Sequence, residues 1–284
     1  EGLELLRGEQ IRDIEPHAAG IEAVRVPQEG IVDYPAVCEA MAKDIGARGG
    51  EVRFSLKVTG LRKGPRWTIL TRAGDYEADF LINCAGLQCD RVSRMAGNRD
   101  TTRIVPFRGE YCQLRPERQF LVRNLIYPVP DPGLPFLGVH CTRMIHGGIE
   151  VGPNAVLALA REGYRRTDFS LRDTVETLTY RGFWRFFLRH PRLCWDELKP
   201  SLSRELFVRS LQRLVPELRS DDLTPGGSGV RAQALSPQGD LVQDFCFVRQ
   251  PAALQVLNAP SPAATASLAI ADHIVDQLQE VLVR

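Results

Sequence analysis

A short apolar run at residues 80–86 carries the strongest information about the fold. It begins with Phe80, Leu81 and Ile82 and ends in the small residues Cys84, Ala85 and Gly86. A run without polar alternation is typical of a strand that is buried on both faces, as in parallel sheets covered by helices. Small residues at the end of a strand let the backbone approach a ligand closely. The run predicts an α/β domain with a candidate ligand site, although a tight strand-to-helix turn would use the same residues.

The flanking segments agree with an α/β fold. Residues 34–45 have apolar side chains at helical spacing, and Gly49–Gly50 ends that helix. Alternating apolar residues predict half-buried strands at 52–58 and 67–71. In the last helix Ser261 is the predicted cap and Pro262 the first residue. We expect its inward face to carry Ala264, Leu268, Ala271, Val275, Leu278 and Leu282.

The middle of the chain has a different pattern. Prolines and glycines interrupt the apolar stretches of residues 103–159, which favours short antiparallel strands. Residues 170–218 have helical spacing, and strands return at 235–248 and 254–257. The fold class is therefore α/β (α+β), with residues 1–102 and 221–284 forming one domain. Residues 103–220 would form an inserted domain with an antiparallel or mixed sheet.

Composition excludes several function classes. The net charge of +1 does not favour nucleic-acid binding. None of the seven cysteines forms a C-x-x-C pair, so we expect no metal site, and their odd number favours reduced thiols in the cytoplasm. The sequence has no apolar run long enough for a transmembrane helix and no visible signal peptide, which leaves peripheral association with the inner membrane open.

Two further motifs combine small residues with groups that bind anions. Arg231 follows the small residues Gly226–Gly229, and its guanidinium fork matches a carboxylate, although a structural ion pair would use it equally well. Residues 260–265 begin the last helix without bulky side chains, so its N–H groups can face developing negative charge or simply be capped. In a third motif, His140 and Thr142 alternate with Val139 and Cys141 and would face one cavity, although a lone histidine is more often structural.

In this order, the motifs resemble one family, the L-2-hydroxyglutarate dehydrogenases/oxidases of the D-amino-acid-oxidase-like FAD superfamily. The likeness spans nearly the whole chain. It rests on residues 30–34, 84–91, 104–111, 124–131, 136–140, 152–158, 229–235 and 258–265.

The resemblance implies an FAD site and a substrate site. Residues 1–102 and 221–284 would be a Rossmann-like FAD-binding domain, and residues 103–220 a substrate-binding domain. Val58 would contact the adenosine end of FAD through its backbone. The remaining cofactor contacts would be Cys84, Ala85, Gly86, Gly229, Val230, Ser261, Pro262, Ala263 and Ala264. Arg231 would bind a substrate carboxylate, with Tyr127, Thr142, Arg143 and Arg108 as further substrate contacts.

The implied reaction is oxidation of (S)-2-hydroxyglutarate to 2-oxoglutarate, with His140 and Arg231 as candidate catalytic residues. The electron acceptor is open between oxygen, a quinone and an electron-transfer protein. The sequence has no G-x-G-x-x-G loop for the FAD diphosphate. We therefore expect the chain to be a fragment of the enzyme with an incomplete FAD-binding domain. The alternatives are a related FAD-dependent amino-acid or amine oxidase, an inactive truncated product, or a subunit that needs a partner.

Overall fold

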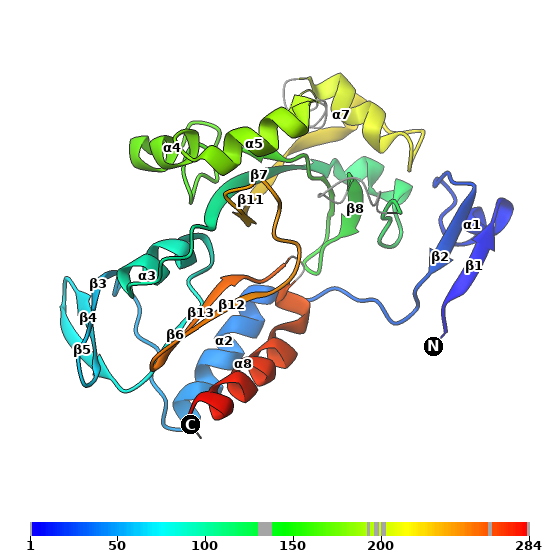
Figure 1. Cartoon of the computed structure of the whole chain (residues 1–284). Coiled ribbons are helices and arrows are strands. Elements are labelled where there is room, and N and C mark those ends of the chain that lie inside the picture. Colours follow the sequence, from blue (N-terminus) through cyan, green and yellow to red (C-terminus); the bar gives the residue numbers. More distant parts are fainter. Residues whose placement is uncertain are drawn as a thin grey trace.

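The structure is a computed structural model that describes residues 2–129, 138–191, 194, 195, 199, 203–260 and 263–282. Figure 1 shows the arrangement of its helices and strands. The strands are β1 (Glu4–Arg7), β2 (Glu22–Arg25), β3 (Val58–Lys63), β4 (Trp67–Thr71), β5 (Gly74–Ala78), β6 (Leu81–Asn83), β7 (Arg103–Leu114), β8 (His140–Arg143), β9 (Ile149–Gly152), β10 (Val156–Leu157), β11 (Leu223–Leu235), β12 (Cys246–Gln250) and β13 (Ala253–Asn258). The α-helices are α1 (Glu9–Ile14), α2 (Tyr34–Ala47), α3 (Cys89–Met95), α4 (Leu171–Leu178), α5 (Arg181–Arg189), α7 (Arg204–Leu211) and α8 (Ser267–Leu282). Short 3₁₀ helices are η1 (Gly86–Gln88), η2 (Pro116–Leu121), η3 (Ser220–Asp222) and η4 (Ala263–Ala266).

The largest sheet is antiparallel and is built on β7 and β11. These strands pair from Arg103↔Leu235 to Leu223↔Leu114, and β10, β9 and β8 extend the sheet on the other edge of β7. The pair arches beneath α4, α5 and α7 (Figure 1). Apolar side chains of α5 and α7 pack on the sheet in two buried clusters. The predicted antiparallel strands and the helical segment after them are confirmed.

A second sheet, β12–β13–β6, contains the parallel pair that the apolar run predicted. Residues 253–255 of β13 pair with residues 81–83 of β6 in parallel register. Ile274 of α8 packs on Leu254 and Val256 of this sheet. A separate antiparallel sheet, β3–β4–β5, is anchored by Trp67, whose Nε1 donates to the carbonyl of Ala252 at 2.7 Å. The α/β class is thus confirmed.

The contacts agree only partly with a division into residues 1–102 with 221–284 and residues 103–220. The parallel pair joins residues 81–83 to residues 253–255, as a split domain requires. However, β11 lies in the sheet of the middle segment. Residues near the N-terminus also pack on that segment, since the Glu15 carboxylate accepts hydrogen bonds from the backbone N–H groups of Arg123 and Asn124. The boundaries at 102 and 220 therefore remain a proposal.

Four predictions about elements were wrong. The strand predicted at 235–248 is not continuous, since β11 ends at Leu235 and β12 begins at Cys246. Residues 52–57 form no strand, since only Val58 and the residues after it pair with β4. The strand at 80–86 shrinks to Leu81–Asn83, and Ile82 is 43% exposed instead of buried. In α8, Leu278 packs inward as predicted, but Leu268 and Val275 are exposed, and the inward face is completed by Ile270 and the buried Ile274. In each case the sequence shows which side chains are apolar, but it does not show which of them a neighbouring element covers.

Candidate functional site

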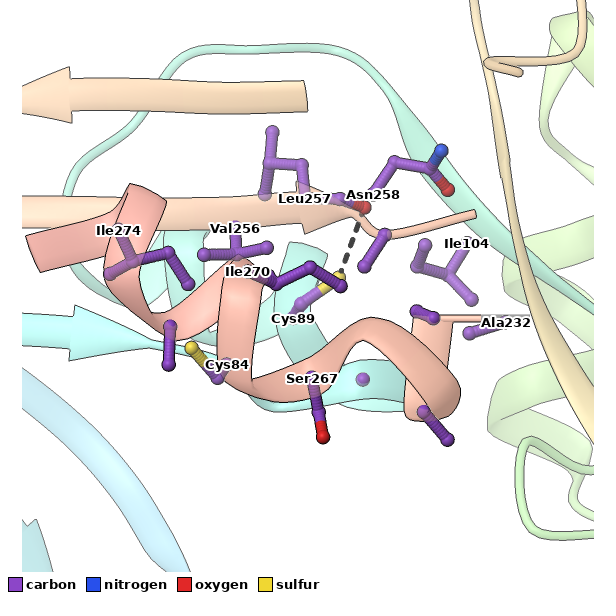
Figure 2. A pocket seen from close by; sticks show the side chains of 15 residues that line it. Cys84, Cys89, Ile104, Ala232, Val256, Leu257, Asn258, Ser267, Ile270 and Ile274 are labelled. Atoms are coloured by element: carbon purple, nitrogen blue, oxygen red, sulfur yellow. Dashed lines mark hydrogen bonds between the residues drawn. The ribbon is translucent and has the colours of Figure 1, made fainter. Parts of the chain in front are cut away.

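A cavity of about 390 Å³ opens where the two parallel strands end. The ends of β6 and β13 form one wall, and η4 with the first turns of α8 forms another (Figure 2). Ligands of α/β proteins bind in this place, outside the carboxyl ends of parallel strands. The lining residues are Cys84, Gly86, Cys89, Ile104, Ala232, Val256, Leu257, Asn258, Ala259, Ala263, Ala264, Ser267, Ile270, Ala271 and Ile274.

Buried amides fix the wall formed by β6. The Asn83 Nδ2 donates to the Cys89 carbonyl at 2.8 Å and to the Gln255 Oε1 at 2.9 Å. The Asn83 Oδ1 accepts from the N–H of Ala85 at 3.1 Å, which turns the chain into η1. Gly86 follows with φ of 51°, a conformation that glycine adopts without strain, and a Cβ built there would meet no atom within 4 Å. The backbone at Gly86 is therefore accessible to a ligand.

The cavity contains no charged side chain among its lining residues. Burial raises the pKa of Cys89 to about 12, helped by the charge of Asp90, so this thiol stays protonated. Its Sγ donates to the Leu257 carbonyl, as the dashed line in Figure 2 shows. Burial also raises the pKa of Cys84. The lining is thus apolar and uncharged, with small side chains at its rim, and it suits a flat aromatic group.

A polar cluster lies on β8 and the segment before it. The rings of Tyr127 and His140 stack with centroids 4.3 Å apart, and the Tyr127 hydroxyl lies 3.2 Å from the Thr142 Oγ1. The His140 Nδ1 lies 3.1 Å from the Gly138 carbonyl oxygen. A carbonyl only accepts, so Nδ1 must donate, and in the neutral ring Nε2 carries the lone pair. Burial lowers the pKa of His140, although the Gly138 hydrogen bond opposes this.

Arg231 lies on β11, opposite Phe107 of β7. Burial lowers the pKa of its guanidinium, which nevertheless remains charged at neutral pH. Strand alternation places Arg231 on the same face of the sheet as His140, but the stretch of β7 from Phe107 to Tyr111 separates them. Gly229 pairs with Gly109, and a Cβ built on Gly229 would meet no atom within 4 Å.

The other predicted site residues are spread over the molecule. Cys84, Gly86, Ala263 and Ala264 line the cavity, and Ala85 lies between two of them. Val58 begins β3 and is not among the lining residues, and Val230 pairs with Arg108. Ser261 and Pro262 lie outside the described residues.

The two arginines suggested as further substrate contacts are already hydrogen-bonded. Arg108 is buried, with its Nη2 at 3.0 Å from the Glu110 Oε1, so substrate contact would require this ion pair to open. Arg143 is exposed at the end of β8, and its Nη1 donates to the Arg123 carbonyl at 3.1 Å.

Several lining residues were missed at the sequence level. Ile104 and Ala232 come from the middle sheet, and nothing in their local pattern indicates that they reach a cavity of the other sheet. Asn83 belongs to the same run as Cys84, Ala85 and Gly86, but its buried hydrogen bonds to Cys89 and Gln255 could not be read from the sequence. Among the described residues, no group of three His, Cys, Asp or Glu side chains is arranged for a metal ion. Likewise, no described helix is both long and apolar enough to cross a bilayer.

Two solved structures have a similar fold. The fold resembles L-alpha-glycerophosphate oxidase from Mycoplasma pneumoniae with FAD bound (TM-score 0.73, 17% identity, 98% of this chain and 64% of that one). It also resembles glycine oxidase from Bacillus cereus (TM-score 0.65, 14% identity, 99% of this chain and 66% of that one). At these identities the likeness shows the fold alone.

The sequence comparisons are more specific. A family model described as FAD dependent oxidoreductase matches residues 1–277. The L-2-hydroxyglutarate dehydrogenase of Escherichia coli O17:K52:H18 is 47% identical, over 98% of this chain and 67% of its own length. The mitochondrial L-2-hydroxyglutarate dehydrogenase of Caenorhabditis briggsae is 44% identical, over 97% and 66%. The chain belongs to the FAD dependent oxidoreductase family, in the branch of the L-2-hydroxyglutarate dehydrogenases. It spans about two thirds of the length of these relatives.

Proposed function

We propose that this chain supplies the substrate side and part of the cofactor side of an enzyme that oxidises (S)-2-hydroxyglutarate to 2-oxoglutarate with FAD. The observation that carries the proposal is the uncharged cavity at the ends of β6 and β13, in a chain 47% identical to an L-2-hydroxyglutarate dehydrogenase. The reaction removes a hydride from C2 and a proton from the hydroxyl group. FAD, when bound, accepts the hydride.

The cavity fits the isoalloxazine part of FAD. Its volume lies in the range of ligand pockets, and its rim carries the small residues Gly86, Ala232 and Ala263 that let a flat ring approach the backbone. Asn258 at its edge holds the chain in place, since its Nδ2 donates to the carbonyls of Val242 and Asp244. Val58, Ala85, Gly229, Val230, Ser261 and Pro262 remain proposed cofactor contacts. The diphosphate would require a donor loop that these 284 residues do not contain.

His140 is the proposed base for the hydroxyl proton. Its Nδ1–H is held by the Gly138 carbonyl, its ring is stacked on Tyr127, and burial favours the neutral form. A neutral, oriented imidazole whose Nε2 carries a lone pair meets the requirements of a general base. Thr142 and Tyr127 share the same cluster and would hydrogen-bond the substrate oxygens.

Arg231 is the proposed partner of a substrate carboxylate. A partly desolvated guanidinium on a rigid strand binds a carboxylate through two parallel hydrogen bonds. The dianionic substrate has a second carboxylate, for which Arg143 is the proposed contact and Arg108 a candidate only if it leaves Glu110. The electron acceptor would be oxygen, a quinone or an electron-transfer protein, and we propose a cytoplasmic location with or without peripheral attachment to the inner membrane.

Anaerobic reduction of the FAD-loaded enzyme, with a segment that binds the FAD diphosphate joined to this chain, tests this function. Addition of (S)-2-hydroxyglutarate should bleach the flavin absorption and yield 2-oxoglutarate in equal amount. The R enantiomer, glycine and L-proline are the matched controls, because a related amino-acid oxidase would use Arg231 on an amino acid instead. Bleaching by an amino acid but not by (S)-2-hydroxyglutarate would exclude the proposed substrate.

A further inference from the structure

A buried network of charges lies directly behind the cavity wall. Arg161 and Asp90 are its centre, with side chains 4% and 3% exposed. The Arg161 guanidinium holds both oxygens of Asp90, with its Nη2 at 2.8 Å from Oδ2. Arg91 extends the network outward to Asp173 and Glu176 of α4. It therefore connects α3 to the segment that leads into α4.

Arg161 also reaches the turn that forms the cavity wall. Its Nη1 donates to the carbonyl of Leu87 at 2.7 Å, in the middle of η1, which begins at the lining residue Gly86. The Asp90 Oδ2 accepts from the N–H of Ile104, another lining residue, at 3.3 Å. One arginine thus fixes, directly or through Asp90, the backbone next to two parts of the lining.

Stability alone is a weak reason for such a pair. Buried ion pairs often add little to stability compared with apolar residues of the same volume, because both charges must leave water. What the pair does provide is a fixed geometry, since a guanidinium fork accepts few arrangements of its partners. Gly86 in particular has a left-handed φ and no neighbour on its open side, so its position depends on the residues that follow it.

We infer that Arg161 is a positioning residue of the cofactor site. It holds η1 and the start of β7 apart, so that the cavity between them is wide enough for the flavin ring. This inference rests on the proposed function, because it assumes that the cavity takes the ring. Arg161 is not among the lining residues and touches no reacting atom.

The test uses lumiflavin, which is the isoalloxazine ring without the ribityl phosphate chain, so that binding does not depend on a diphosphate loop. Quenching of lumiflavin fluorescence by the 284-residue chain gives a dissociation constant. The variant is Arg161→Lys, which keeps the charge and loses the fork. The matched control is Arg91→Lys, since Arg91 lies in the same network but donates to the side chain of Gln88 in η1, whereas Arg161 donates to the backbone carbonyl of Leu87. Circular dichroism gives the folded fraction of each variant, and the constants are compared per folded molecule.

We expect Arg161→Lys to weaken lumiflavin binding at least about tenfold, which is about 1.4 kcal/mol, and Arg91→Lys to change it less than about twofold. Equal constants for Arg161→Lys and the parent chain, or equal weakening by both variants, would make Arg161 a general structural residue and overturn the inference. A parent chain that does not quench lumiflavin would instead remove the cavity from the proposed function, and the inference with it. The two failures are therefore distinguishable.

Discussion

At the scale of single residues, the site depends on side chains whose charge state is set by their surroundings. Arg231 keeps its charge in a partly buried position, whereas His140 is driven toward neutrality by burial. These opposite tendencies match the roles proposed for them, one binding an anion and the other accepting a proton.

Substitution of Arg231 by lysine, in the enzyme restored with its FAD diphosphate-binding segment, tests the proposed carboxylate contact. Loss of a bidentate, charge-assisted contact should cost about 2–5 kcal/mol of transition-state binding. Because each 1.4 kcal/mol corresponds to a factor of ten, kcat/KM for 2-hydroxyglutarate should fall at least about thirtyfold. The flavin-to-protein absorbance ratio should stay unchanged. If Arg231→Lys turned over 2-hydroxyglutarate within about twofold of the parent, the carboxylate contact would have to be sought at Arg143 or Arg108.

The pH dependence of the reaction, in the same restored enzyme, tests His140. Its pKa is below the ordinary value of 6.5, so the base form persists to lower pH than in an exposed histidine. We expect the acid limb of kcat/KM to lie below pH 6.5 and His140→Asn to lower kcat by roughly a hundredfold or more. For stability, the unfolded state binds the proton more readily, so the contribution of His140 is complete above pH 6.5 and decreases as the pH falls below it. An unchanged acid limb in His140→Asn would assign the base to another residue.

At the scale of helices and strands, the atoms that surround a glycine determine whether a side chain can be added there. Gly182 of α5 lies against the Ser236 carbonyl and the Tyr180 ring, so the Cβ of Gly182→Ala would overlap both. We expect that variant to lose about 1–3 kcal/mol of unfolding free energy in urea denaturation. Gly229→Ala is the control, because its Cβ would meet open space and should change stability by less than about 0.5 kcal/mol. Similar losses in both variants would mean that α5 does not pack as described.

The elements also show what the sequence can predict. The helix at 34–47, the strand at 67–71 and the antiparallel strands after residue 103 follow from periodicity and from breakers. The strand predicted at 52–57 does not form. Alternation of apolar residues indicates only that a segment could be a strand, and residues 52–57 have no neighbouring strand to pair with. The face of α8 was misjudged because this helix has apolar residues on more than one stripe, and only packing selects Ile274 over Val275.

The candidate site was also predictable only in part, because local sequence patterns reveal some of its residues and contacts distant in sequence bring in the others. Cys84, Gly86, Ala263 and Ala264 are small residues at strand or helix ends, and the structure brings them to one cavity. Arg161 was not found, because its role comes from a contact with Leu87 that is distant in sequence. Ile104 and Ala232 reach the cavity only through the pairing of β7 with β11.

At the scale of the whole molecule, the chain has an apolar cavity, which is the proposed site of the flavin ring, but its sequence has no G-x-G-x-x-G loop for the diphosphate. Helix N-termini with such loops supply the N–H groups that bind this part of FAD. We therefore expect the purified 284-residue protein to bind FAD weakly or not at all. Its visible spectrum after gel filtration should lack the flavin band at about 450 nm. A stoichiometric flavin band would show that the ring site alone is sufficient.

The parallel pairing of β6 with β13 also has a consequence for the order of folding. The Asn83–Gln255 contact joins residues 172 apart in sequence. If β7 and β11 pair first, Arg103 is held beside Leu235. The loop that the β6–β13 pairing must then close consists of only two stretches of about 20 residues, 83 to 103 and 235 to 255. Closing this shorter loop costs roughly 1 kcal/mol less conformational entropy. The amides of residues 81–83 and 253–258 should therefore gain hydrogen-exchange protection after those of β7 and β11, so the cavity at the ends of β6 and β13 should form after the large antiparallel sheet.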